Sequence, residues 1–231
     1  MNSAQTSNLT GQAYNIIIKK IINAEYKPGQ KISEKKIEAD INIGRTPVRE
    51  ALLQLRQENL INVIPQSGTY ISKIDMKEVL DARLVRASVE QRIMRDATTV
   101  RLTHEEVDTF KQILSKQYLI MKEDSFTNFL TSDDEFHRYF YVITDHLRIW
   151  NWLKRINIQF DRFRFLRLKI EGLSWVGLID EHKALLEAVR ERDINEVERL
   201  TANHMHRMLT EEDSLIRAFP NYFINYTLGN K

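Results

Sequence analysis

Residues 42–56 read NIGRTPVREALLQLR, and this stretch decides how the first third of the chain folds. With 3.6 residues per turn, its apolar residues fall on one side of a helix: Val48, Ala51, Leu52 and Leu55. A narrow stripe of arginines lies beside that face: Arg45, Arg49 and Arg56. A DNA recognition helix needs both, because it packs on its own domain while guanidinium groups grip phosphates or guanine acceptors. Taken alone, the stripe also fits an ordinary amphipathic helix with solvated arginines.

The elements around this helix favour the DNA-binding interpretation. Residues 9–24 and 34–40 are expected to form two preceding helices, and Pro47 lies in the first turn of the third, where proline is tolerated. Two short apolar segments, 61–64 and 69–72, flank a Pro-Gln-Ser-Gly turn and predict a hairpin. Helix, helix, turn, helix and hairpin is the order of a winged helix-turn-helix domain.

The distribution of charge agrees with this interpretation. The net charge is +2, but residues 1–72 hold nine Lys/Arg and six Asp/Glu, a net of +3, whereas the remainder holds 25 and 26, a net of −1. A basic excess confined to the first third hints at a polyanionic partner there.

Proline and glycine divide the chain into two parts. Three of the four prolines and four of the seven glycines precede residue 69, and no proline occurs between Pro65 and Pro220. So long a stretch without helix breakers, rich in Leu, Ile, Glu, Arg and Lys, predicts a helical bundle. We therefore expect a mainly α-helical chain, with a winged helix-turn-helix domain over residues 1–72 and an all-helical domain over residues 73–231. The helices expected in the second domain cover residues 76–99, 104–122, 126–144, 147–171, 177–191 and 194–213.

Composition excludes several classes of protein. The 231 residues are 42% hydrophobic and 29% charged, which is enough apolar material for a globular core. Cysteine is absent, so a disulfide scaffold, a thiol nucleophile and a cysteine-based zinc finger are excluded. The longest uncharged stretch, residues 1–18, has neither a basic start nor a long apolar centre. We therefore expect no signal peptide and no membrane span, and the cytoplasm is the expected location.

Polar residues on apolar helix faces mark a candidate site in the second domain. Asp133 and His137 interrupt one such face, four residues apart and side by side. His182 and His204 interrupt the faces of two later helices, whereas His206 lies about 200° round from His204 and is expected to face outward. Each residue alone fits a hydrogen-bonded core side chain. Four buried groups of metal-binding type are costly without a shared partner, so the spacing leaves a metal site and a polar core both open.

Four runs in the first domain form a recognisable set of motifs: Ser33-Glu34-Lys35-Lys36-Ile37, Gly44-Arg45-Thr46-Pro47-Val48-Arg49-Glu50-Ala51-Leu52, Asn59-Leu60-Ile61 and Gly68-Thr69-Tyr70-Ile71. Over roughly residues 10–72 they resemble the GntR family of bacterial transcription regulators. The resemblance implies that Arg45 and Arg49 contact bases and phosphates, that Thr46 contacts a phosphate, and that the wing tip around Gly68 enters the minor groove. Lys35 falls where the family commonly has an arginine near the DNA backbone.

The chain departs from the family pattern just before the recognition helix. The family usually reads Gly-x-Ser there, and this chain has Asn42-Ile43-Gly44. The serine cap is therefore absent, and Asn42 is expected to adopt the left-handed conformation that the tight turn requires.

The second domain contains the motifs Asp133-x-x-Phe136-His137, Glu181-His182-x-x-Leu185-Leu186-Glu187-Ala188, the downstream His204 and Arg86-x-x-x-Glu90. With these motifs it resembles the all-helical FCD domain of the FadR subfamily within that family. The resemblance implies that Asp133, His137, His182 and His204 bind a divalent metal ion, with a small carboxylic acid at the remaining coordination positions. Nitrogen and oxygen ligands suit zinc, nickel or manganese. Arg86 is expected either to pair with the carboxylate of the acid or to form a salt bridge with Glu90.

One further stretch alternates aromatic and basic residues. Residues 160–167 read FDRFRFLR, a pattern that could indicate RNA binding. Its spacing is helical, so we interpret it as bundle core with a basic flank that could also line the effector pocket or a dimer contact.

The sequence therefore predicts a homodimeric, DNA-binding transcription regulator. Two recognition helices would enter successive major grooves of a palindromic double-stranded operator, and a carboxylic acid at the metal site would alter their placement. Repression is favoured over activation. Two alternatives are a metal-dependent hydrolase and a regulator that senses the metal alone. The hydrolase is disfavoured, because the helix faces supply no obvious general base beside the metal ligands.

Overall fold

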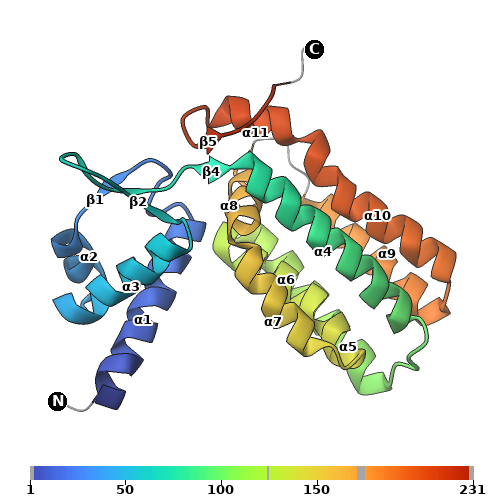
Figure 1. Cartoon of the computed structure of the whole chain (residues 1–231). Helices are drawn as coiled ribbons and strands as arrows, with labels where there is room; N and C mark the ends of the chain where they lie inside the picture. Colours follow the sequence, from blue (N-terminus) through green and yellow to red (C-terminus); the bar gives the residue numbers. More distant parts are fainter. Residues whose placement is uncertain (1–2, 124, 171–174, 229–231) are drawn as a thin grey trace. The chain divides into compact units, whose positions relative to one another are not determined.

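The computed structural model describes residues 3–123, 125–170 and 175–228, which form two compact units (Figure 1). The first unit comprises the chain up to Met76 together with Phe219–Tyr226. The second comprises Lys77–Ala218 and the residues that follow Tyr226. That a C-terminal segment joins the first unit is a feature that the sequence pattern does not indicate.

The first unit is a winged helix-turn-helix fold, as the sequence predicts. Its helices are α1 (Ser3–Ile22), α2 (Glu34–Ile41) and α3 (Arg45–Gln57), and its wing is formed by β1 (Lys31–Ile32), β2 (Ile61–Ile64) and β3 (Gly68–Ile71). The three strands are antiparallel in the order β1-β3-β2, with Tyr70 of β3 between Lys31 and Asn62. Strand β1 is absent from the sequence-based expectation, because two residues are too few to show alternation.

The core of the first unit lies between α1 and α3. The apolar face predicted for the recognition helix is confirmed, since Val48, Ala51, Leu52 and Leu55 are buried. Helix α3 packs against α1, whose Ala13, Ile17 and Ile21 are fully buried. The opposite side of α3 is left for its polar residues.

The turn between α2 and α3 has the geometry that the sequence predicts. Asn42 caps the end of α2 in the left-handed region, with φ 52° and ψ 41°, a conformation that asparagine adopts more readily than most residues. Gly44 occupies the cap position of α3, where it offers no side-chain oxygen. The turn therefore contains the left-handed Asn42, and α3 begins without a side-chain cap.

The second unit is a helical bundle. Its helices are α4 (Met76–Ala97), α5 (His104–Lys122), α6 (Phe126–Ile143), α7 (Leu147–Ile156), α8 (Ile158–Arg167), α9 (Trp175–Glu191), α10 (Ile194–Thr210) and α11 (Glu212–Ala218). Helix α5 packs against both α6 and α9, and α9 packs against α10. Buried aromatic rings fill the space between α5 and α6, where Phe110 contacts Phe136 and Phe140.

Two of the predicted helices are wrong in their extent. The single helix predicted over residues 147–171 is two helices, α7 and α8, and residue 171 lies outside the described residues. They meet at Asn157, whose φ of −88° and ψ of 6° bend the chain while its N–H and C=O stay bonded to both helices. The helix predicted over residues 194–213 likewise ends at Thr210, and α11 begins after Glu211.

The basic flank predicted within residues 160–167 is also wrong. The whole of this segment is buried, including its three arginines. The guanidinium of Arg164 pairs with three aspartates, Arg167 pairs with Glu211, and Arg162 donates to the Gln159 carboxamide at 2.9 Å. Ion pairing and hydrogen bonding offset the cost of burying these cations.

The C-terminal segment Phe219–Tyr226 returns to the first unit. Strand β5 (Phe223–Ile224) pairs in parallel with β4 (Ile74–Asp75), which directly precedes α4. The Ile74 N–H donates to the Tyr222 carbonyl at 2.8 Å, and Phe223 is buried. The chain therefore passes between the two units after Met76, after Ala218 and again after Tyr226. Within the described parts of the chain, every helix is too short or too polar to cross a lipid bilayer.

Candidate metal centre and DNA-contacting residues

The residues predicted to contact DNA lie exposed on the first unit. Arg45, Thr46 and Arg49 occupy the first turns of α3 with exposed side chains, and Lys35 is exposed on α2. Arg45 lies 3.5 Å from the Glu34 carboxylate with three quarters of its side chain exposed, so this pair contributes little to stability. Cations on this face remain accessible to a phosphate backbone.

The wing tip adds one cation that the sequence does not single out. Gly68, predicted to lie at the tip, has a φ of 137°, which disfavours any residue with a side chain. The Lys31 side chain from β1 passes directly over Gly68, and its ammonium group lies 5.9 Å from the centre of the Tyr70 ring. Only the pairing of β1 with β3 places Lys31 in the wing, so no local sequence pattern could identify it.

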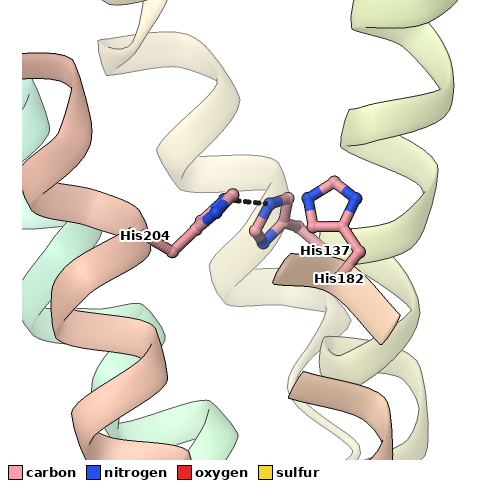
Figure 2. A group of neighbouring side chains, drawn as sticks. All are labelled: His137, His182 and His204. Carbon is pink, nitrogen blue, oxygen red and sulfur yellow. Dashed lines mark hydrogen bonds between the residues drawn. The ribbon is translucent and has the colours of Figure 1, made fainter. Parts of the chain in front are cut away.

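Three histidines from three helices meet inside the second unit. His137 of α6, His182 of α9 and His204 of α10 direct their rings toward one another (Figure 2). The ring centres lie 5.1–5.2 Å apart, and the candidate ligand atoms all lie within 4.8 Å of one another. His206 is exposed, as its helical position predicts. The structure therefore brings together three of the four residues predicted to hold a metal as one cluster.

Each of the three histidines is held through its Nδ1 atom. His182 Nδ1 lies 3.0 Å from Gln117 Oε1, and the Gln117 amide donates to the Ser132 carbonyl, so its oxygen accepts from the histidine. His204 Nδ1 lies 2.7 Å from a Glu181 oxygen, and His137 Nδ1 contacts the Glu90 carboxylate. An acceptor at Nδ1 fixes the tautomer in which Nε2 carries a lone pair.

The three Nε2 atoms consequently face one another as acceptors. His204 Nε2 lies 3.3 Å from His137 Nε2, and among the described residues the buried His182 Nε2 has no hydrogen-bond partner. Burial lowers the pKa of His182 well below its ordinary value and also lowers the pKa of His204, so neither ring is protonated near neutral pH. Lone pairs that converge in a buried space are the donor set of a divalent cation.

Asp133, the fourth predicted ligand, lies beside this cluster but is also engaged elsewhere. Its Oδ1 is 3.5 Å from His182 Nε2, and its Oδ2 is 3.8 Å from His137 Nε2. Oδ2 also accepts from the Arg164 guanidinium. Burial raises the pKa of Asp133, but the surrounding positive groups, Arg164 foremost, together outweigh that effect, and the pKa lies well below its usual range. The carboxylate is therefore ionised and within reach of a shared cation.

Arg86 forms the salt bridge that was one of its two expected roles. Its Nε donates to Glu90 at 2.8 Å, and both side chains are buried. Burial raises the pKa of Glu90, yet Arg86 and His137 more than compensate, so the pKa lies below its ordinary value. Arg86 therefore stabilises the carboxylate that orients His137, and it also lines the cavity described next.

A small cavity adjoins the cluster. Its volume is about 30 Å³, which is room for one or two water molecules. Its walls carry cationic, ligand-type and apolar side chains: Arg86, Arg164, Arg167, Asp133, His137, His204, Phe160, Leu178 and Met205. Cations beside a candidate metal site suit an anionic ligand.

The residues that orient the histidines could not be predicted from the sequence. Gln117 lies on a different helix from every predicted ligand, and its role depends on the packing of α5 against α9. Glu181 precedes His182 in the chain yet contacts His204, and it also pairs with Arg207 at 2.5 Å. Only the assembled bundle reveals these contacts.

Family models match both parts of the chain. Residues 9–71 match the model for bacterial regulatory proteins of the gntR family, and residues 81–207 match the model for the FCD domain. The first match covers the exposed arginines of α3, and the second covers all three histidines of the cluster.

Individual proteins are similar over most of their length. The chain is 28% identical over 203 residues to the HTH-type transcriptional repressor RspR of Escherichia coli K12, which covers 88% of each protein. It is 25% identical over 178 residues to the gluconate operon transcriptional repressor of Bacillus subtilis, which covers 75% of this chain and 72% of that protein. The solved structure of E. coli McbR/YncC superimposes with a TM-score of 0.75 at 19% identity, over 95% of this chain and all of that one. That structure supports the same fold.

Alanine substitution of the histidines separates inward from outward positions. Removing His182 or His204 should abolish stoichiometric metal binding, because each supplies a converging Nε2 atom. Removing the exposed His206 should leave the metal content unchanged. Elemental analysis of the three purified variants measures this, and equal metal content in all three would contradict the site.

Loss of the Gln117 acceptor should weaken metal binding without removing a ligand. In Gln117→Met the His182 ring loses the acceptor that fixes its tautomer, so affinity for Zn²⁺ should fall about 10- to 100-fold. Gln112→Met, an exposed position on the same helix, is the matched control and should bind as wild type does. Competition with a chromogenic chelator gives both affinities, and unchanged affinity in Gln117→Met would contradict the orienting role.

Proposed function

The chain belongs to the gntR family of bacterial regulatory proteins and carries an FCD domain, and from that premise we propose that a small carboxylic acid at a metal site in its second unit controls operator binding by the first. The protein is a DNA-binding transcription regulator and not an enzyme. Similar proteins are named transcriptional repressors or regulators, and the first unit contains the winged helix-turn-helix fold that binds operator DNA.

The observation that supports the metal is the convergence of three Nε2 lone pairs. Each imidazole is oriented by an acceptor at Nδ1, and the two rings with lowered pKa values stay neutral without a cation. We propose that His137, His182 and His204 hold a divalent ion, with Asp133 as the fourth ligand. Zinc, nickel and manganese all accept such ligands. Bound there, the ion supplies a Lewis-acidic centre that attracts a carboxylate oxygen.

The charges around the cavity support an acidic effector. Arg86, Arg164 and Arg167 line the cavity next to the histidines, and each guanidinium already binds carboxylates within the chain. A relative is named for the gluconate operon, and gluconate is itself a carboxylic acid. Gluconate and other small mono- and dicarboxylates are therefore the acids to test.

The first unit would act as half of a dimer. We propose a homodimer that places two α3 helices in successive major grooves of a palindromic operator, with Arg45, Arg49 and Thr46 on bases and phosphates. Lys35 would contact the DNA backbone, and the wing around Gly68 would reach the minor groove. The expected mode is repression, in the cytoplasm where the operator is present.

A second candidate function is a regulator that senses the metal alone. The observation that favours it is the cavity volume of about 30 Å³, far below the roughly 300 Å³ or more of typical ligand pockets. A metal titration read by operator affinity, with and without candidate acids, separates the two functions. An acid that changes affinity only in the presence of metal supports the acid-responsive regulator.

Arginine and lysine substitutions should have different effects on operator binding. Arg49→Ala removes an exposed guanidinium from the proposed recognition helix and should weaken specific binding by about 1–3 kcal/mol. Lys35→Ala should weaken binding to all sequences alike and reduce the salt dependence. Fluorescence anisotropy with operator and scrambled DNA measures both, and wild-type operator affinity in Arg49→Ala would refute the assignment of α3.

A carboxylic acid should lower operator affinity through the metal centre. We expect an effect of about 1–3 kcal/mol, typical of allosteric coupling. His137→Ala should bind operator but lose most of the response, because the anchor for the acid is gone while α3 is untouched. Anisotropy with and without a panel of acids measures this. If an acid releases both proteins equally well, the metal has only a structural role.

A further inference from the structure

Arg167 differs from the other arginines of the cavity in the carboxylate that it binds. Its guanidinium lines the cavity beside His204, and its Nε and Nη2 atoms both donate to the Glu211 carboxylate, the latter at 3.3 Å. Glu211 belongs to none of the long helices of the bundle. It lies at the joint where α10 ends and α11 begins.

The two atoms that Glu211 occupies are those that any carboxylate would use. Two neighbouring N–H groups of a guanidinium form a fork that matches the two oxygens of a carboxylate, whichever molecule carries it. Arg167 is almost fully buried, with 7% of its side chain exposed, whereas 27% of the Glu211 side chain is exposed. The arginine thus faces inward, and its partner reaches it from the solvent side.

The other two arginines cannot exchange their partners so easily. Arg86 and Glu90 are both buried, and the Glu90 carboxylate also holds His137. Arg164 binds Asp133, Asp134 and Asp161 at once. Separating either arginine from its carboxylates leaves charges buried without a partner, which is strongly unfavourable. Glu211 can instead move into water, where its charge is solvated.

The cavity is too small for a carboxylic acid, so side chains that line or adjoin it must move before an acid can bind. About 30 Å³ holds one or two water molecules and excludes even a short carboxylic acid. Withdrawal of the Glu211 side chain would vacate the donors of Arg167 next to the cavity. This withdrawal would break one part-exposed ion pair, between Arg167 and Glu211, and the carboxylate of the acid would form an equivalent pair with Arg167.

We propose that Glu211 is a built-in carboxylate that occupies the position of the effector carboxylate on Arg167, and that the acid binds by displacing it. This inference rests on the proposed function, because it names the arginine that receives the acid and the residue that competes for it. Glu211 therefore sets the acid concentration at which the regulator responds.

Displacement also has a route toward the first unit along the chain. Glu211 lies between α10, which carries His204, and α11, after which the chain enters the segment that forms β5. Strand β5 pairs with β4 immediately before α4. Release of Glu211 from Arg167 would free the α10–α11 joint, and the change would reach the β4–β5 pair through the seven residues of α11.

The test compares two glutamates that are adjacent in the chain. Glu211→Gln removes the competing charge with little change of shape, and Glu211→Ala removes the side chain altogether. Glu212→Gln makes the same charge change one residue later and is the matched control. Each full-length protein is loaded with Zn²⁺ and titrated with gluconate, succinate and acetate. Operator anisotropy and isothermal titration calorimetry give the response midpoint and the acid affinity.

Relief of the competition should lower the midpoint. Both Glu211 variants should respond at an acid concentration about 3- to 10-fold lower than wild type, because a larger fraction of the protein is competent to bind. Glu212→Gln should match wild type. If an acid acts on wild type and on both Glu211 variants at the same midpoint, the displacement model is overturned while the proposed function stands. If no acid binds any of the zinc-loaded proteins, both are overturned.

Discussion

The second unit depends on Arg164, a cation enclosed in the bundle that must be neutralised where it lies. Its guanidinium binds Asp133 and Asp134 of α6 and Asp161 of its own helix, and Lys154 of α7 pairs with two of the same carboxylates. Burial lowers the pKa of Arg164, but these aspartates more than reverse the effect, so the group stays charged. Such a network contributes little to the net free energy of folding. Removing one member is nevertheless strongly destabilising, because its partners are left as buried charges without a counter-ion. It therefore specifies how α6, α7 and α8 meet.

The candidate metal centre adjoins that arrangement, because Asp133 contacts Arg164 and also lies beside the histidine cluster. Its carboxylate accepts from Arg164 and lies within 3.8 Å of two of the converging histidine nitrogens. Glu90 links an arginine to a histidine in the same way, because its carboxylate accepts from Arg86 and also contacts His137. His137 and His204 are thus oriented by carboxylates that arginines hold in turn, Glu90 by Arg86 and Glu181 by Arg207, whereas His182 is oriented by the Gln117 carboxamide. A cation that binds there meets donors already aimed at it, so little conformational entropy is lost on binding.

Helical periodicity explains how much of this could be predicted from the sequence. The spacing of apolar residues places Val48 and Leu55 inside α3, and it turns His137, His182 and His204 toward one interior while leaving His206 outside. Periodicity predicts which face of a helix a side chain lies on, but it does not predict which residues of other helices that side chain contacts. Gln117 and Glu181 act on histidines of other helices, so their roles appear only once the bundle is assembled. The burial of residues 160–167 could not be predicted for the same reason, because it depends on contacts with other helices. Arginines are usually exposed, and their partners at Asp133, Asp134 and Glu211 lie about 30 to 44 residues away.

Two of the covalent connections between the units, after Met76 and after Ala218, lie next to paired strands of the first unit. The first connection follows β4, and the second precedes the segment that forms β5. Because these two strands pair with each other, with the Ile74 N–H bonded to the Tyr222 carbonyl, both connections end at the same small sheet. In the function proposed above, a displacement of either α4 or α11 would act on this one hydrogen-bonded element of the first unit. His137 contacts the α4 residue Glu90, and His204 lies on the helix that leads to α11, so the histidine cluster is connected to both helices. Coupling of this kind is reciprocal: whatever the metal centre does to DNA affinity, operator binding does in return to the affinity of that centre for its ligand.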